Sequence, residues 1–179
     1  MQLTFSAYYS LILAVLVLLL GKFLVNRIRF LRDYNIPEPV AGGLVIAAVI
    51  LILNLTLGWT FSFATDLQTA FMLVFFSSIG LSANFAKLRE GGLGLIVFTL
   101  VISAFILVQN GVGMGLAAAL GLDPLIGVVA GSITLVGGHG TAGAWGPVLE
   151  QEYGLTGATT LGIACATCGL VIGSIMGGP

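Results

Sequence analysis

The charged residues of this chain are confined to a few short clusters, and the stretches between the clusters are long and apolar. Only 7% of the 179 residues are charged and 58% are hydrophobic, whereas about a quarter of a soluble domain is charged. Several uncharged runs reach the length of about 20 residues that a helix needs to cross a bilayer core about 30 Å thick. The sequence therefore predicts an all-α membrane protein.

Five apolar runs have the length of membrane-spanning helices, and we expect them to form a single membrane domain over residues 1–179. The predicted spans cover approximately residues 7–25, 40–57, 67–83, 95–120 and 154–178. The first run is longer than the apolar core of a signal peptide and follows no basic segment. We therefore interpret it as a retained helix.

The positive charges predict the orientation of these spans. All six Lys and Arg residues lie in two loops, one after the first span and one after the third. Because Lys and Arg accumulate in cytoplasmic loops, both loops are expected inside the cell and the N-terminus outside. Six basic residues in two short loops make no nucleic-acid groove, so we expect no nucleic-acid partner.

Residues 124–149 form an uncharged stretch that is interrupted near its middle by the sequence Gly137-Gly138-His139-Gly140. Glycine favours turns over continuous helix and lets other groups approach the backbone closely. Irregular backbone at membrane depth survives only when it is buried in protein or lines a wet cavity. A binding or permeation site is therefore expected here.

Two topologies are compatible with the interrupted stretch. It either enters and leaves on one side as a re-entrant helix-loop-helix segment, or it crosses the membrane completely. The acidic residues that follow, Glu150 and Glu152, discriminate little between the two. We favour re-entry because a stretch so rich in glycine, with Pro147 after it, is a poor continuous helix. The C-terminus would then be cytoplasmic.

The ends of half-helices supply the chemistry expected of such a segment. Free N–H groups at a helix N-terminus can face an anionic substrate, and free carbonyls can coordinate sodium. We predict substrate binding by the residues of the turn and assign sodium to a hydroxyl beside it. The predicted substrate residues are Gly137, Gly138, His139, Gly140 and Thr141, and the predicted sodium ligand is Thr134.

The role of His139 stays open from the sequence alone. It could hydrogen-bond a substrate carboxylate, carry a proton, or act as a neutral structural donor, because burial disfavours its charged form. Elsewhere, Asn110 is the strongest further substrate candidate, since the pair Gln109-Asn110 is costly to place against lipid. Ser77 and Ser78 are weaker candidates for sodium, because serines in membrane helices commonly bond to a helix backbone.

Two other sequence features are expected to be structural. Gly127 and Gly131 lie four residues apart, a spacing that favours close helix packing over ligand binding. Cys165 and Cys168 have no second Cys/His pair to complete a metal site.

A single histidine and the lack of a Walker-type phosphate loop argue against an enzyme. We therefore expect no catalytic residues and no cofactor other than a coupling ion.

Four motifs in order resemble the bacterial sodium/glutamate symporter family. They are Ile-Pro-Glu-Pro-Val-Ala-Gly-Gly-Leu at 36–44, Ser-Ile-Gly-Leu-Ser-Ala at 78–83, Gln-Asn-Gly-Val-Gly at 109–113 and Gly-Gly-His-Gly-Thr at 137–141. The resemblance covers essentially the whole chain. It implies an inner-membrane secondary transporter that imports L-glutamate with sodium by alternating access. It also implies two halves of opposite orientation, each with five spans and a re-entrant loop.

The chain stops just after the expected fifth span, so it resembles only the first half of such an inverted-repeat transporter. The expected partners are L-glutamate, sodium, membrane lipid, the missing C-terminal half and a second copy in a homodimer. A citrate-type or other dicarboxylate symporter, a channel and a membrane scaffold subunit remain alternatives.

Overall fold

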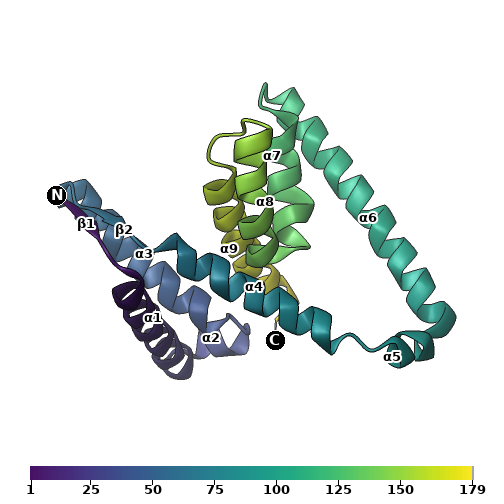
Figure 1. Cartoon of the computed structure of the whole chain (residues 1–179), viewed down its shortest axis with the longest axis horizontal. Coiled ribbons are helices and arrows are strands. Elements are labelled where there is room, and N and C mark those ends of the chain that lie inside the picture. Colours follow the sequence, from purple (N-terminus) through teal and green to yellow (C-terminus); the bar gives the residue numbers. More distant parts are fainter. Residues whose placement is uncertain (179) are drawn as a thin grey trace. The chain divides into compact units, whose positions relative to one another are not determined.

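The computed structural model describes residues 1–178 (Figure 1). These residues form two compact units. The first unit comprises Met1–Leu81 together with the residues from Gly173 onward, and the second comprises Ser82–Ile172. The elements of the first unit are β1 (Gln2–Thr4), α1 (Ala7–Arg27), α2 (Arg29–Asp33), α3 (Glu38–Leu57), β2 (Thr60–Ser62) and α4 (Thr65–Ser82).

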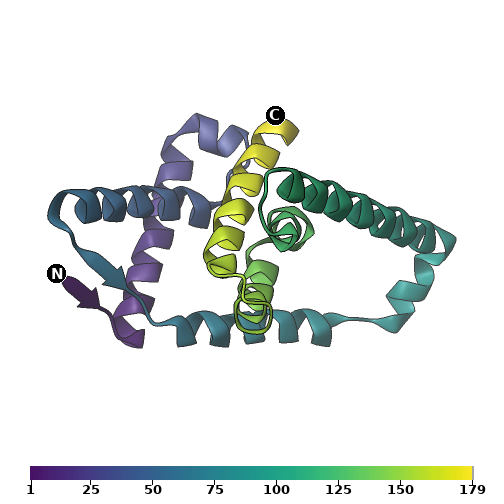
Figure 2. The same ribbon diagram turned by 90° about the horizontal axis from the view of Figure 1, so that it is seen from above.

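Helices α1 and α3 cross at a pair of glycines, Gly21 and Gly42 (Figure 2). A Cβ atom added to Gly42 would collide with the carbonyl oxygen of Val17 and lie 3.1 Å from the Cα atom of Gly21. A Cβ atom on the neighbouring Gly43 would meet nothing within 4 Å. The two backbones therefore touch directly, as they do where small residues line a membrane helix interface.

Strands β1 and β2 pair in parallel, with Leu3 opposite Phe61. Phe5 stacks on Phe63 just beyond the pair, with ring centroids 5.5 Å apart. This pairing joins the start of α1 to the segment that follows α3. The basic residue Arg27 ends α1, about 30 Å away along a helix that rises 1.5 Å per residue. The strand pair and the basic residue Arg27 thus lie at opposite ends of α1.

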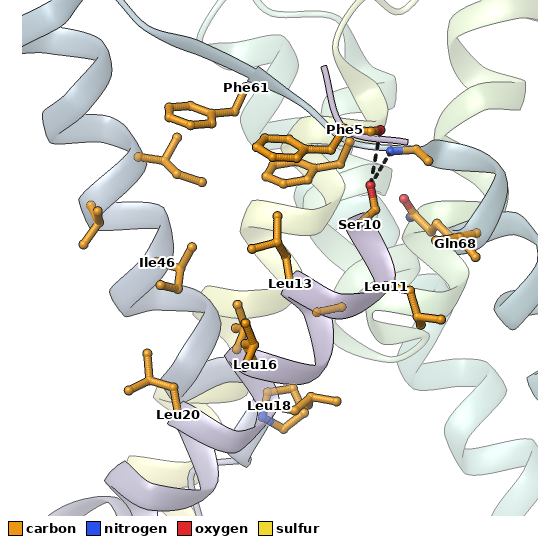
Figure 3. Close-up of a pocket in the computed structure, with 18 of the residues that line it drawn as sticks. Phe5, Ser10, Leu11, Leu13, Leu16, Leu18, Leu20, Ile46, Phe61 and Gln68 are labelled. Carbon is orange, nitrogen blue, oxygen red and sulfur yellow. Dashed lines mark hydrogen bonds between the residues drawn. The ribbon is translucent and has the colours of Figure 1, made fainter. Parts of the chain in front are cut away.

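The first unit contains an apolar pocket of about 870 Å³ between α1, α3, α4 and the strand pair (Figure 3). Ser10 lies at its edge, where its hydroxyl accepts a hydrogen bond from the amide of Ala64 at 3.1 Å and approaches the carbonyl of Phe5 at 3.5 Å. Gln68 is the other polar side chain of the lining, and no described lining residue is ionisable. The pocket therefore offers no charge to a carboxylate substrate.

The second unit is also helical. Its elements are α5 (Phe85–Glu90), α6 (Gly92–Ala119), α7 (Pro124–Val128), the π-helical turn η1 (Val129–Ile133), α8 (Gly138–Glu152) and most of α9 (Ala158–Gly177). Asp123 caps α7 by accepting a hydrogen bond from the amide of Leu125 at 2.8 Å, and Pro124 suits the first helical position. These caps start a new helix shortly after α6 ends.

Four described helices are long and apolar enough to cross a membrane, namely α1, α3, α6 and α9. In the most apolar window of α6, 0% of the residues are buried. Apolar surface of this extent needs lipid or further protein rather than water around it. The mainly helical membrane fold predicted from the sequence is confirmed, with one short strand pair added. Helix α4 covers the remaining predicted span and carries Asp66 and Gln68 in its first turns.

Candidate functional site

The stretch 124–149 folds as a helical hairpin, with α7 and η1 forming one arm and α8 the other (Figure 1). A small apolar core joins Val129 on the first arm, Leu149 near the end of α8, Leu155 in the loop after α8, and Ala158 at the start of α9. The start of the first arm also packs against this core through Leu125. Both arms of the hairpin therefore reach the same end of the second unit.

The tip of the hairpin meets α9 near its middle and meets α6 nine residues before its end. His139 contacts Thr167, which lies nine residues after Ala158, the first residue of α9. Ser132 contacts Asn110, which lies nine residues before Ala119, the last residue of α6. Nine residues of helix rise about 14 Å, close to half of a bilayer core about 30 Å thick.

The first arm breaks at Gly131, whose backbone angles are φ −95° and ψ −114°. The amide of the next residue, Ser132, donates to Oδ1 of Asn110 at 3.4 Å. The buried hydroxyl of Thr134 donates to the carbonyl of Gly131 at 3.5 Å. Two side chains thus bond to backbone groups beside the break, as membrane proteins require where a helix is interrupted.

Helix α8 begins at the tip and presents an uncapped N-terminus. The chain turns at residues 136–137, and Gly138 adopts φ +74°, a left-handed conformation that glycine accepts readily. No side chain caps the N-terminus of α8. The hydroxyl of Thr141 instead donates to the carbonyl of Gly137 at 3.0 Å. The amides of the first turn carry the positive end of the helix dipole.

The ring of His139 contacts a hydroxyl group on α9. Its Nε2 lies 2.9 Å from the hydroxyl oxygen of Thr167. The single hydroxyl proton of Thr167 is donated to the carbonyl of Ile163 at 2.9 Å. With its proton directed to Ile163, the Thr167 oxygen is available to accept a hydrogen bond from Nε2–H. This contact joins the tip of the hairpin to the middle of α9.

Replacing His139 by Ala and Thr167 by Val, singly and together, should show coupled losses of stability in the purified transporter. We expect a coupling free energy of about 1 kcal/mol, since a hydrogen bond contributes that order of stability and contacting residues are not additive. The measurement is the unfolding midpoint of each variant. Thr99 also donates to its own helix, to the carbonyl of Leu95 at 2.8 Å. The loss of stability from Thr99→Val should therefore be additive with the loss from His139→Ala. Additive effects of His139→Ala and Thr167→Val would contradict the contact.

The structure brings most of the predicted site residues together in the second unit. Asn110, Thr134 and the turn residues 137–141 all belong to the hairpin or contact it. Ser77 and Ser78 belong to α4 in the first unit, where the hydroxyl of Ser78 donates to the carbonyl of Phe75 at 2.7 Å.

Three residues of this site could not be identified as site residues from the sequence, namely Gly131, Ser132 and Thr167. Gly131 was expected to pack closely against a neighbouring helix, but a Cβ atom at this position would make only ordinary contacts, the nearest 3.5 Å from Asn110 Oδ1. Its function in the structure is to break the first arm. Thr167 looks like any other threonine in an apolar span, so only the folded contact identifies it.

Comparisons with known proteins agree with one another. The family model described as "Sodium/glutamate symporter" matches residues 3–179. A sodium/glutamate symporter of Haemophilus influenzae is 52% identical over 179 residues, which is 100% of this chain and 44% of the relative. A sodium/glutamate symporter of Escherichia coli K12 is 50% identical over 170 residues, which is 95% of this chain and 42% of the relative.

No solved structure matches the chain significantly. The chain spans less than half the length of the curated relatives that it matches. The family match, by contrast, extends over almost all of the chain and includes every element of the hairpin. The chain belongs to the sodium/glutamate symporter family, a family of transporters rather than enzymes.

Proposed function

We propose that this chain is the N-terminal half of a secondary transporter that imports L-glutamate with sodium across the bacterial inner membrane. The observation that carries the proposal is the hairpin with the uncapped N-terminus of α8 at its tip. The tip contacts α9 nine residues, or about 14 Å, from the start of that helix. Family membership and the names of the relatives support the substrate and the ion. Transport proceeds by alternating access, as is general for carriers with a binding site near the bilayer midplane.

The substrate site that we propose lies at the first turn of α8. Free amides at Gly138, His139 and Gly140 can donate to a glutamate carboxylate, and a helix N-terminus stabilises a nearby anion by about 0.3–2 kcal/mol. Gly137 lets the chain turn tightly before these amides, and Thr141 supports that turn. Asn110 uses Oδ1 to hold the helix break, and its Nδ2 can donate to the substrate.

For sodium, we propose the hydroxyl of Thr134 beside the helix break, and Ser77 and Ser78 as weaker candidates. Thr134 is 2% exposed and lies next to the carbonyl of Gly131, so hydroxyl and carbonyl oxygens converge at this point. Sodium binds such neutral oxygens at unwound helices. Sodium acts here as the coupling ion, and we propose no other cofactor.

The proposed topology has five spans and a re-entrant hairpin, with the N-terminus outside and the C-terminal end of this half in the cytoplasm. Within the first unit, the strand pair and the basic end of α1 lie at opposite ends. Within the second unit, Lys87 and Arg89 on α5 precede the start of α6, whereas the hairpin follows its end. If the basic ends face the cytoplasm, the hairpin enters from outside.

We further propose that a C-terminal half of inverted orientation completes the substrate site, and that two transporters form a homodimer surrounded by lipid. Sites in inverted-repeat transporters lie at the interface of the repeats. The coverage of 42–44% of the relatives supports this division. The second half would supply further ligands for the substrate.

The test is uptake of labelled L-glutamate by cells that express the uninterrupted reading frame containing this segment. We expect uptake that requires sodium, fails when potassium replaces it, and is saturable. Aspartate and citrate serve as competitors. Sodium-independent conductance would favour a channel, and efficient inhibition by citrate with little glutamate uptake would favour a dicarboxylate symporter. No transport of any kind by a correctly folded protein would favour a scaffold. Uptake by the purified 179-residue chain alone would refute the proposed need for a second half.

A further inference from the structure

We propose that Gln109, together with Asn110, forms a sodium site at the break of the hairpin. This inference rests on the proposed function, because it takes sodium as the coupling ion. The observation behind it is that Oε1 of Gln109 is buried and has no hydrogen-bond partner among the described residues. Buried polar atoms without a partner are uncommon in native proteins and call for a specific explanation.

The location of Gln109 points to the hairpin break. A Cβ atom built on Gly131 would lie 3.5 Å from Oδ1 of Asn110, 3.9 Å from Cγ of Gln109 and 4.0 Å from the carbonyl oxygen of Gln109. Gln109 and Asn110 therefore flank the residue with non-helical backbone angles. Because Gly131 has no side chain, there is room for the two amide side chains of α6 beside the interrupted backbone of the first arm.

The chemistry of this group matches a monovalent cation better than an anion or a divalent metal. The candidate ligands are Oδ1 of Asn110, the hydroxyl and carbonyl oxygens of the Gly131–Thr134 turn, and Oε1 of Gln109, whose side chain runs past Gly131. All are neutral, and no group of three or more His, Cys, Asp or Glu residues occurs within the described part of the chain. Neutral oxygens at an unwound helix are the ligands that sodium meets in transporters.

A second buried oxygen without a partner has a different environment. Oγ1 of Thr159 lies 2.5 Å from the position of a Cβ atom on Gly146, near the start of α9. There Glu150 accepts a hydrogen bond from the amide of Thr159 at 2.9 Å. This oxygen is packed between α8 and α9 away from the break, so it is no part of the proposed site.

The test compares Gln109→Met with Gln109→Glu in the purified full-length transporter, without glutamate. Sodium should raise the unfolding midpoint of the parent protein relative to potassium, since a ligand that binds the folded state stabilises it. Gln109→Met removes the oxygen at similar volume, so at least tenfold more sodium should be needed for the same rise. Gln109→Glu keeps an oxygen ligand and should retain the sodium response. In potassium, the Met variant should unfold at or above the parent midpoint, because an unpartnered polar atom is removed.

Gln68→Met is the matched control, because Gln68 lines the apolar pocket of the first unit. Its sodium response should equal that of the parent. An unchanged sodium response in Gln109→Met, with a raised KM for glutamate, would overturn the sodium site and assign Gln109 to the ammonium group of the substrate. A loss of response in Gln109→Glu as well as Gln109→Met would also refute the oxygen-ligand role. Absence of sodium-dependent uptake in the parent would refute the proposed function itself, a separate result from either of these.

Discussion

Gly127→Ala in the full-length transporter is expected to reduce sodium-dependent glutamate uptake to background and to lower the unfolding midpoint. Gly113 of α6 and Gly127 of α7 touch backbone to backbone, and a Cβ atom on Gly127 would collide with the carbonyl group of Gly113. Even from the other side, a Cβ atom on Gly113 would lie only 2.5 Å from the carbonyl oxygen of Gly127. Such overpacking typically costs about 1–3 kcal/mol and here involves rigid backbone on both sides.

The loss of uptake follows because Gly127 lies just before the break at Gly131. Pushing α7 away from α6 would lengthen the contact between Ser132 and Asn110, which is already 3.4 Å. Gly115→Ala is the matched control, since a Cβ atom at Gly115 of α6 meets nothing within 4 Å. Near-normal uptake by Gly115→Ala is expected. Equal behaviour of the two variants would show that the α6–α7 contact does not support the site.

Gly138→Val is expected to lower uptake at least tenfold, while Gly138→Asn should lose far less. Gly138 has φ +74°, and a Cβ atom at this position meets nothing within 4 Å. The cost of a substitution is therefore conformational rather than steric crowding by neighbours. A left-handed conformation costs most residues about 1–2 kcal/mol, is more costly still for a β-branched residue, and is tolerated best by Asn. A cost of 1.4 kcal/mol corresponds to about a tenfold change in an equilibrium constant.

The measurement for Gly138 is the initial rate of glutamate uptake at several substrate concentrations, normalised to the amount of protein in the membrane. We expect Gly138→Val to raise the KM for glutamate, because the amides of the α8 first turn would no longer point together. Similar KM values for the Val and Asn variants would mean that the left-handed turn is not needed for binding. If sodium still raises the unfolding midpoint of Gly138→Val normally in the absence of glutamate, the defect of this variant lies only in substrate binding at the first turn of α8.

The long apolar helices could be located from the sequence because hydropathy and length depend on local composition. Helix α1 covers the predicted run 7–25, and α3 covers the predicted run 40–57. The ends of the elements follow local signals too, such as Gly58, whose φ of +65° ends α3. Signals of this kind lie within a few residues of the structure that they specify.

The inner geometry of the hairpin could not be predicted in the same way. The sequence placed the turn at 137–140, whereas the chain turns at residues 136–137, and α8 starts at Gly138 and continues through Pro147. The additional break at Gly131 depends on Asn110, which lies on another helix. Likewise, the position of His139 depends on Thr167. Contacts between residues 20 or more positions apart leave no local periodicity to detect.

The depth of the hairpin tip has an electrical consequence. Moving one elementary charge across a membrane changes its energy by about 2.3 kcal/mol per 100 mV. In the proposed topology, and if the electric field falls evenly across the bilayer, a sodium ion at the break would have passed through about half of the field, which corresponds to about 1.2 kcal/mol per 100 mV. Sodium binding from outside would then tighten several-fold as the cell interior becomes more negative. The membrane potential would therefore load the carrier with its coupling ion before any domain has moved.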